Sequence, residues 1–292
     1  MSVDVAAAAS FLATHGRVLD RRRLELVLGD PGTDAVLAAL DGYRNPDGGY
    51  GWGLEPDLRS PESQPTGAMH AFEVMAEIGP ATTPRAVGLC DWLDGHSLPD
   101  GGLPLALPLR DPAGCASWWA GADHGTSSLQ MTAQVAAGAH LVARHDRRVN
   151  DHPWLARATA WCLDAIARLE GEPHAHALLF ATRFLDALGD REAGAGALLD
   201  GLARWLPPDG VVPVKGGTAG EALRPLDFAP RSGTRARELF TDEVVAAELD
   251  RLASRQQPDG GWVVDFAAAS PAAALEWRGY ATVSAVAVLQ DR

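Results

Sequence analysis

The chain has 292 residues, of which 47% are hydrophobic and 22% are charged; this length and balance suffice for a full hydrophobic core in one large domain or two small ones. The formal net charge is −13, and Lys215 is the only lysine among 25 basic residues. Because so acidic a surface repels phosphate backbones and anionic lipid headgroups, the charge argues against nucleic-acid binding and electrostatic membrane docking.

The three cysteines, Cys90, Cys115 and Cys162, are odd in number and none form a C-x-x-C pair. This pattern indicates reduced thiols rather than a disulfide framework. No apolar run approaches the length of a membrane span, and the first residues lack the basic segment of a secretory signal. We therefore expect a cytoplasmic protein without integral membrane contact, and the oligomeric state stays open.

Taken in chain order, the segments alternate between two kinds of expected helix. Residues 66–78, 127–142 and 272–289 are apolar on nearly every side, as is typical of helices buried all round. Residues 153–170 and 241–256 carry apolar side chains on one face and charged ones on the other, as is typical of helices with one face in water. No segment shows convincing strand alternation, and about eleven helices are expected in all.

A Pro-Asp-Gly-Gly tetrapeptide recurs between these segments. Complete copies occupy residues 46–49, 99–102 and 258–261, and residues 208–211 are a near copy that ends in Val. Proline sets φ at the first corner of such a turn, Asp bonds its own backbone and Gly takes a positive φ. We expect positive φ among these glycines, including the second of each pair: Gly49, Gly102 and Gly261. Four copies in one chain indicate a repeat architecture.

Buried and amphipathic helices that alternate about a repeated turn predict two concentric rings of helices. The predicted fold is therefore all-α, an α/α toroid, formed by a single domain over residues 1–292. The alternative is an open α-solenoid, in which both helices of each pair would be amphipathic. About six inner helices are expected, and about five outer ones around them. The inner helices would lie near residues 3–14, 66–78, 127–144, 174–188, 233–240 and 272–290.

The repeat resembles that of a known superfamily. Residues 256–262, Gln-Gln-Pro-Asp-Gly-Gly-Trp, look like the QW-type repeat of squalene–hopene cyclases and related terpene cyclases. Residues 44–53, Arg-Asn-Pro-Asp-Gly-Gly-Tyr-Gly-Trp-Gly, look the same and are also similar to the repeat of protein prenyltransferase β subunits. The resemblance covers most of the chain as a repeat pattern. It implies the α/α toroid, and with the Ala- and Arg-rich composition it suggests a small, single-domain actinobacterial member.

The catalytic signatures of those families are incomplete here. Class II terpene cyclases carry Asp-x-Asp-Asp-Thr at the start of an inner helix, whereas residues 62–66 read Glu-Ser-Gln-Pro-Thr, in which only Glu62 is acidic. Asp111 and Cys115 are four residues apart rather than the two of the prenyltransferase zinc ligands, and no Asp-Asp-x-x-Asp motif is present. No metal and no cofactor are predicted, except Mg²⁺ if the substrate is a diphosphate.

Long loops follow the turns and point to a site. By topology they all emerge at the N-termini of the inner helices, on one side of the ring, where helix dipoles favour anionic groups. Together they would wall one mouth of a central cavity. The acid–base candidates there are Asp57, Glu62, Asp123, His124, Asp265 and Glu276. The ligand-binding candidates are Trp52, Glu55, Arg59, Trp118, Trp119, Asp227, Trp277, Arg278 and Tyr280.

Each candidate also has a structural interpretation. Trp52 can pack the repeat turn, and the loop acids can be solvated or cap helices. Glu276 and Arg278 open the most apolar helix and can pair with each other. His174 and His176 are two positions apart on a helix and face different ways, so they do not indicate a metal site.

The resemblance implies a protein that binds or transforms an isoprenoid or another apolar small molecule in the central cavity, with ring faces to stabilise a cation. The first alternative is a carbohydrate-active toroid, a hydrolase or a lyase, in which aromatics stack on sugars and carboxylates do acid–base work. The second is a toroid that binds a small molecule without catalysis. A closed apolar cavity favours the isoprenoid, and an open acidic groove favours the sugar.

Overall fold

A computed structural model describes residues 3–30, 32–79 and 84–291 and is mostly helical, with 57% of the chain in helices. Six helices line the middle of the molecule: α2 (Val18–Val27), α4 (Pro65–Ile78), α7 (Leu129–Ala143), α10 (Ala175–Leu188), α12 (Pro225–Phe228) and α14 (Pro271–Gln290). Six more lie around them: α1 (Val5–His15), α3 (Thr33–Asp41), α5 (Pro84–His96), α9 (Pro153–Ala167), α11 (Ala195–Leu202) and α13 (Asp242–Ser254). Inner and outer helices alternate strictly along the chain.

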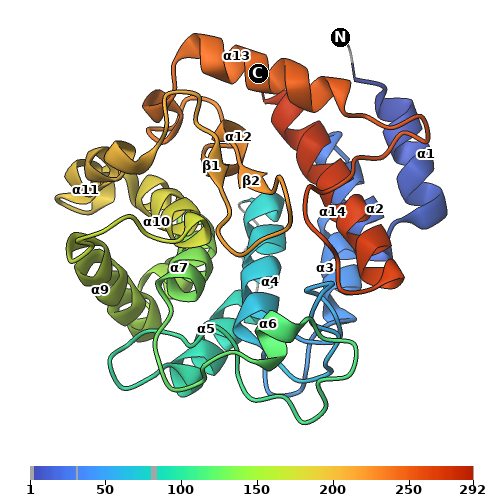
Figure 1. Ribbon diagram of the computed structural model, residues 1–292. Helices are drawn as coiled ribbons and strands as arrows, with labels where there is room; N and C mark the ends of the chain where they lie inside the picture. The colour runs from blue at the N-terminus through green and yellow to red at the C-terminus, as the bar shows by residue number, and fades with distance from the viewer. Residues whose placement is uncertain (1–2, 31, 80–83, 292) are drawn as a thin grey trace.

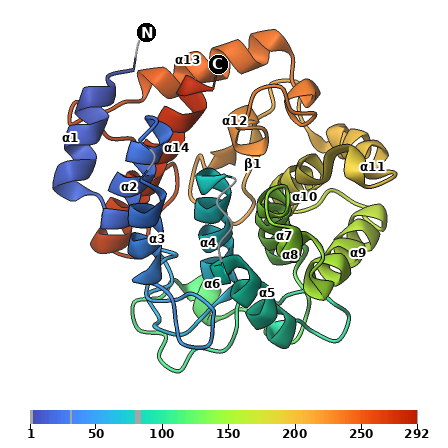
Figure 2. The same cartoon turned by 180° about the vertical axis from the view of Figure 1, so that it is seen from behind.

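The inner helices form a ring through successive contacts. α14 packs on α2, α2 on α4, α4 on α7, α7 on α10 and α10 on α12, while α13 contacts both α12 and α14 and so joins the two ends of the chain of contacts. Figures 1 and 2 show α1, α5, α9, α11 and α13 at the periphery from both sides, and both chain ends near α13. The predicted α/α toroid is confirmed.

Short elements occupy the connections. α6 (Ser117–Ala120) and α8 (Arg147–Asn150) lie in the links that flank α7, and 3₁₀ turns occur at Gly189–Arg191, Ala203–Trp205 and Arg237–Leu239. Strands β1 (Val212–Pro213) and β2 (Ala222–Leu223) pair antiparallel, with Val212 opposite Leu223. This hairpin lies over the middle of the ring in Figure 1.

Two of the expected inner helices are placed wrongly by the sequence. Residues 3–14 correspond to α1, which is an outer helix, and the inner position belongs to α2. The reason is that the buried face of α2 carries Asp20 and Arg23, whose charges are paired rather than absent. Residues 233–240 contain only a 3₁₀ turn, and the short helix α12 takes that inner place. An apolarity criterion cannot recognise an inner helix that buries ion pairs.

The repeat turns depend on their first glycine for conformation and on their second for space. Gly48, Gly101 and Gly260 have φ of 95°, 95° and 91°, whereas their following glycines do not have positive φ, so the expectation for the second glycine of each pair was wrong. A Cβ on Gly102 would lie 2.5 Å from the Ser127 Cβ and 2.8 Å from the Trp161 ring. The second position therefore requires glycine because side chains pack directly against its backbone.

The turn aspartates tie adjacent parts of the ring together. Asp47 accepts hydrogen bonds from the Gly49 amide (2.9 Å), the Ser63 hydroxyl (2.8 Å) and the Trp92 indole of α5 (3.2 Å). Asp100 accepts the equivalent three bonds, from Gly102, Ser127 and the Trp161 indole of α9. In each case one carboxylate joins the turn to the segment that leads into the next inner helix, and also to the outer helix that follows.

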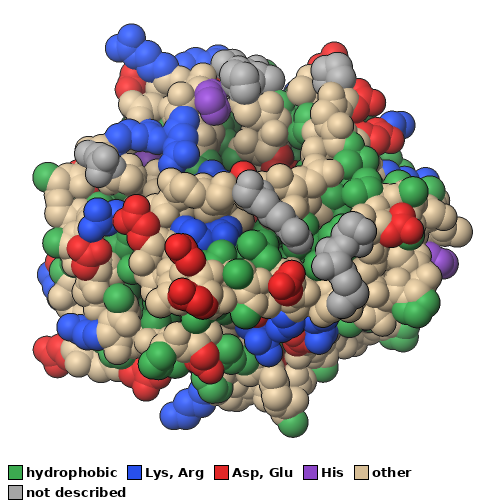
Figure 3. Space-filling model, turned by 90° about the horizontal axis from the view of Figure 1, so that it is seen from above, with side chains coloured by type: hydrophobic (Ala, Val, Ile, Leu, Met, Phe, Trp, Pro, Cys, Tyr) green, Lys and Arg blue, Asp and Glu red, His purple; other side chains and the backbone are tan. Residues whose placement is uncertain are grey.

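The surface carries mixed charges. Figure 3 shows acidic and basic side chains interspersed over one face, with no broad area of a single sign. Among the described residues, no helix combines the length and the apolar character that crossing a bilayer requires.

Candidate functional site

A polar stripe runs along α4, on the face that α2 and α14 cover. Thr66, His70, Glu73 and Glu77 recur at helical spacing on this otherwise apolar helix. The opposite face carries Phe72, whose ring stacks on Trp154 of the outer helix α9 at a centroid distance of 6.4 Å. The helix therefore directs its apolar side outward, into the layer between the rings, and its polar side inward.

His70 lies in the middle of this stripe, between two carboxylates. Its Nδ1 is 2.9 Å from Glu73 Oε2, and its Nε2 is 3.1 Å from Glu55 Oε2. Ionised carboxylates only accept hydrogen bonds, so both ring nitrogens carry hydrogen in this arrangement. Burial alone would lower the pKa of His70, but the bonds to Glu55 and Glu73 outweigh it and raise that pKa to about 9. At neutral pH the group is an imidazolium held between two glutamates.

Glu73 also accepts a hydrogen bond from α14. The Tyr280 hydroxyl lies 3.1 Å from its Oε1. Burial raises the pKa of Glu73, but the hydrogen bond and the charge of His70 outweigh this effect and lower it below its ordinary value, so the side chain is a carboxylate. Burial raises the pKa of Tyr280, which stays a neutral hydroxyl donor. The rings of Trp277 and Tyr280 pack edge to face, with their centroids 5.5 Å apart and an interplanar angle of 89°, and both rings stand beside His70.

Ion pairs from α2 complete the polar wall. Arg23 donates two hydrogen bonds to Glu77, at 2.6 and 2.8 Å, and its guanidinium lies 5.1 Å from the centre of the Tyr280 ring. Arg17 holds Asp20 in the same two-pronged way, at 2.9 and 3.1 Å. Buried charges persist where they are paired in this geometry. Arg23 thus connects α2 to Glu77 of α4 and to the Tyr280 ring of α14, while the Arg17–Asp20 pair lies at the start of α2 itself.

The centre of the cluster is reached by solvent although it lies deep in the protein. Glu73 is enclosed by the inner helices, yet 25% of its side-chain surface is accessible. Arg183 of α10 acts electrostatically on both Glu73 and Tyr280, so α10 lies across from them, and its Nε donates to the Asp227 carbonyl at 2.7 Å. Charged and polar groups from α4, α10 and α14 thus act on one another inside the ring, and solvent reaches part of Glu73.

Asp57 fastens the loops at the entrance to this cluster. Its two carboxylate oxygens accept hydrogen bonds from the Ala269 amide (2.7 Å) and the Trp277 indole (2.8 Å), and only 1% of the residue is exposed. Burial raises the pKa of Asp57, and the two donors act in the opposite direction. Both oxygens are thus occupied, and the side chain positions Trp277 and the loop before α14.

The structure brings together a minority of the residues that the sequence singles out. Glu55, Asp57, Trp277 and Tyr280 belong to the cluster around His70. Glu276 lies at its edge and pairs with Arg59 at 2.8 Å, which joins the first loop to the start of α14.

Other predicted residues lie in separate contacts of their own. Trp52 and Trp118 are 59% and 50% exposed, and the Trp52 indole donates to Asn45 near the first repeat turn. Trp119 is buried in the main hydrophobic core, and its indole nitrogen has no partner among the described residues. The three tryptophans therefore do not form one wall with Trp277.

The remaining polar candidates are engaged locally. Their contacts are the following: Glu62 with Ser60 and Arg110, Asp123 with the Gly125 amide, His124 with the Ala106 carbonyl, Asp227 with the Arg224 amide at the start of α12, Asp265 with Arg255, and Arg278 with Asp259. Arg278 also lies over the Phe11 ring of α1, 4.5 Å from its centre. These contacts hold turns and helix ends.

The sequence missed His70, Glu73, Thr66 and Arg23 as site residues. The signal for the first three is present, because they form a polar stripe on a helix that is otherwise apolar. Arg23 carries no such signal, since its partner Glu77 lies 54 positions away. Among the described residues, no three His, Cys, Asp or Glu side chains are arranged to hold a metal ion.

Comparison with known proteins supports the fold and extends no further. No protein-family model and no curated protein matches the sequence. Among solved structures, a protein from Actinoplanes shares 16% sequence identity with a TM-score of 0.58, over 98% of each chain. At this identity the likeness shows a common helical fold over the whole length.

Proposed function

We propose that the protein binds a small, hydroxyl-rich molecule such as a sugar or a polyol inside the ring and abstracts a proton from it, with Glu73 as the general base. The observation that carries this proposal is the state of Glu73. It is a carboxylate held between His70 and Tyr280, deep in the ring, with part of its surface still accessible. A base in such a position accepts a proton from a bound hydroxyl or from an activated carbon.

The character of the surrounding groups favours a polar ligand. Glu73, Arg183 and Tyr280 offer a carboxylate, a guanidinium and a hydroxyl from three different inner helices. An apolar substrate would leave the remaining hydrogen-bonding capacity of these groups unsatisfied, whereas a polar ligand can use it. A molecule with several hydroxyl groups can bond to all three, and Trp277 provides a ring of the kind that packs against sugars.

An isoprenoid is the second candidate, and one observation favours it. Phe266, Trp277 and Tyr280 form a continuous group of rings, with Phe266 and Trp277 in edge-to-face contact at 5.2 Å. Ring faces in an enclosed site stabilise a carbocation. The repeat pattern shared with terpene cyclases adds to this candidate. The Asp57 carboxyl, whose pKa is raised by burial, is the acid nearest to these rings.

Calorimetric binding assays on the purified protein separate the two candidates. The panel contains neutral monosaccharides and disaccharides, sugar acids, polyols, isoprenyl diphosphates and squalene-like polyenes. We expect the sugars, sugar acids and polyols to include a compound that binds. Glu73→Gln should lose turnover of that compound and retain its binding, and the exposed control Glu238→Gln should behave as the wild-type protein does. Binding of isoprenoids alone would replace the first candidate by the second. If no member of the panel binds, both candidates are wrong.

A further inference from the structure

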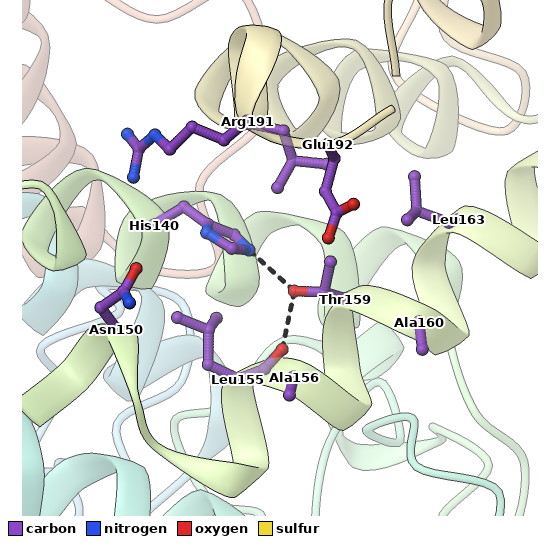
Figure 4. Close-up of a pocket in the computed structure, with 10 residues that line it drawn as sticks. His140, Asn150, Leu155, Ala156, Thr159, Ala160, Leu163, Arg191 and Glu192 are labelled. Atoms are coloured by element: carbon purple, nitrogen blue, oxygen red, sulfur yellow. Dashed lines mark hydrogen bonds between the residues drawn. The ribbon is translucent and has the colours of Figure 1, made fainter. Parts of the chain in front are cut away.

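A hollow lies between the inner and outer helical layers. It has a volume of about 330 Å³, near the lower end for small-molecule sites, and opens between the end of α7, α8, α9 and the link from α10 to α11 (Figure 4). Its floor is apolar and is formed by Leu155, Leu163 and Leu188. Charged and polar groups stand above this floor.

Two opposite charges border the hollow without partners of their own. Arg191 and Glu192 are adjacent in sequence, and among the described residues neither forms an ion pair or a side-chain hydrogen bond. Figure 4 shows the guanidinium of Arg191 directed toward the side of Asn150 and the carboxylate of Glu192 directed toward Thr159. The hollow therefore presents a cationic and an anionic group at two ends of one polar rim.

His140 lies between these charges and offers a hydrogen-bond acceptor. The Thr159 hydroxyl is 2.7 Å from the Leu155 carbonyl, which can only accept, so the hydroxyl donates there. The His140 Nε2 at 2.7 Å from the same hydroxyl must then be the donor of that bond. Burial, together with Arg191 and Arg144, lowers the pKa of His140 to about 4, so the ring is neutral and its Nδ1 carries a lone pair.

We propose that this hollow binds a zwitterionic α-amino acid with an apolar side chain. Arg191 holds the carboxylate, Glu192 and His140 Nδ1 accept hydrogen bonds from the ammonium group, and the leucines of the floor cover the side chain. A free carboxylic acid leaves Glu192 unpaired, and a free amine leaves Arg191 unpaired. A volume of about 330 Å³ accommodates a free amino acid.

The experiment compares three probes by isothermal titration calorimetry: L-leucine, 4-methylpentanoate, which lacks the amino group, and 3-methylbutylamine, which lacks the carboxylate. We expect L-leucine to bind. Each analogue should bind at least about tenfold more weakly, because each loses one charge-assisted contact. An analogue that binds as tightly as L-leucine overturns the proposal, and so does the absence of binding by all three.

Single substitutions locate the binding. Arg191→Gln should weaken the binding of L-leucine and 4-methylpentanoate but not that of 3-methylbutylamine. Glu192→Gln should weaken the binding of L-leucine and 3-methylbutylamine but not that of 4-methylpentanoate. Arg168→Gln is the matched control, since Arg168 is an exposed arginine at the end of α9 that pairs with Asp164. Both test positions are exposed, so circular dichroism should show an unchanged fold. Binding of L-leucine that survives both substitutions would place it elsewhere and overturn the proposal.

Discussion

His70 and Glu73 lie one helical turn apart on α4 and share a hydrogen bond of 2.9 Å between Nδ1 and Oε2, inside a ring of helices. The same imidazole reaches Glu55, in the loop that precedes α4, with its other nitrogen. One cationic ring thus bonds to two carboxylates and joins the loop to the helix.

Replacing His70 by leucine should destabilise the protein strongly. The substitution leaves Glu55 and Glu73 close together without the positive charge that they share, and breaking a buried ion pair in this way costs about 3–5 kcal/mol. Urea unfolding followed by circular dichroism measures the change in the free energy of unfolding. His145→Leu, at an exposed position after α7, is the control and should change it by less than about 0.5 kcal/mol. A His70 variant as stable as this control would show that the two hydrogen bonds contribute nothing.

The same contact predicts how stability depends on pH. The pKa of His70 is about 9 in the folded protein and its ordinary value is 6.5, so the folded state binds the proton more tightly. The stabilisation is therefore fully present below about pH 6.5 and is lost as the pH rises through 9. Glu73, whose pKa is lowered, contributes in the opposite direction, and its stabilisation is lost only as the pH falls below 4.5.

Melting temperatures measured from pH 6 to pH 10 test this dependence. We expect a decline above pH 7 in the wild-type protein and a flatter profile in His70→Gln, which can still donate one hydrogen bond but does not titrate. Equal profiles for the two proteins would mean that the decline comes from other groups.

The repeat turns predict a contrast between two glycines. Gly260 has a φ of 91°, and a Cβ there would lie 2.2 Å from the Ala7 carbonyl oxygen of α1. Gly260→Ala therefore combines backbone strain with a clash against main chain, and we expect a loss of about 2–4 kcal/mol. Gly171→Ala is the control, because a Cβ there meets nothing within 4 Å. Thermal denaturation of both variants measures the difference, and a Gly260 variant that melts with the control would contradict the role given to the turn.

The fold could be predicted because its signals are local. The conformation of a Pro-Asp-Gly-Gly turn and the polarity of a helix face depend on residues a few positions apart, so the order of inner and outer helices was largely recoverable. The charged helix α2 was not predicted as an inner helix, because Glu77, which pairs with the buried Arg23, lies on another helix. The need for glycine at the second position of a turn, as at Gly102, arises from the close approach of the Ser127 side chain, which only the tertiary structure brings there.

The site was recoverable in part for the same reason. The loops after the turns do supply Glu55 and Asp57, as their position before inner helices indicates. Their partners His70 and Trp277 come from helices that are 15 and 220 positions away. Acidic and aromatic residues in the other loops look equivalent in sequence but pair within their own surroundings, as Asp265 does with Arg255. Sequence spacing does not distinguish a carboxylate that finds an interior partner from one that finds a surface arginine.

Asp57 provides the last prediction. Its carboxylate accepts from both the Ala269 amide and the Trp277 indole, so it ties the loop before α14 to the first loop and orients the indole beside His70. In Asp57→Asn, one acceptor becomes an NH₂ group that faces a donor, and one of the two bonds is lost. We expect faster hydrogen exchange in residues 263–270 and a loss of about 1–3 kcal/mol in the free energy of unfolding. The tryptophan fluorescence should shift because Trp277 loses its fixed partner. Asp123→Asn, at an exposed turn, is the control and should leave exchange in that loop unchanged. If exchange at 263–270 is equal in the two variants, Asp57 does not hold the loop.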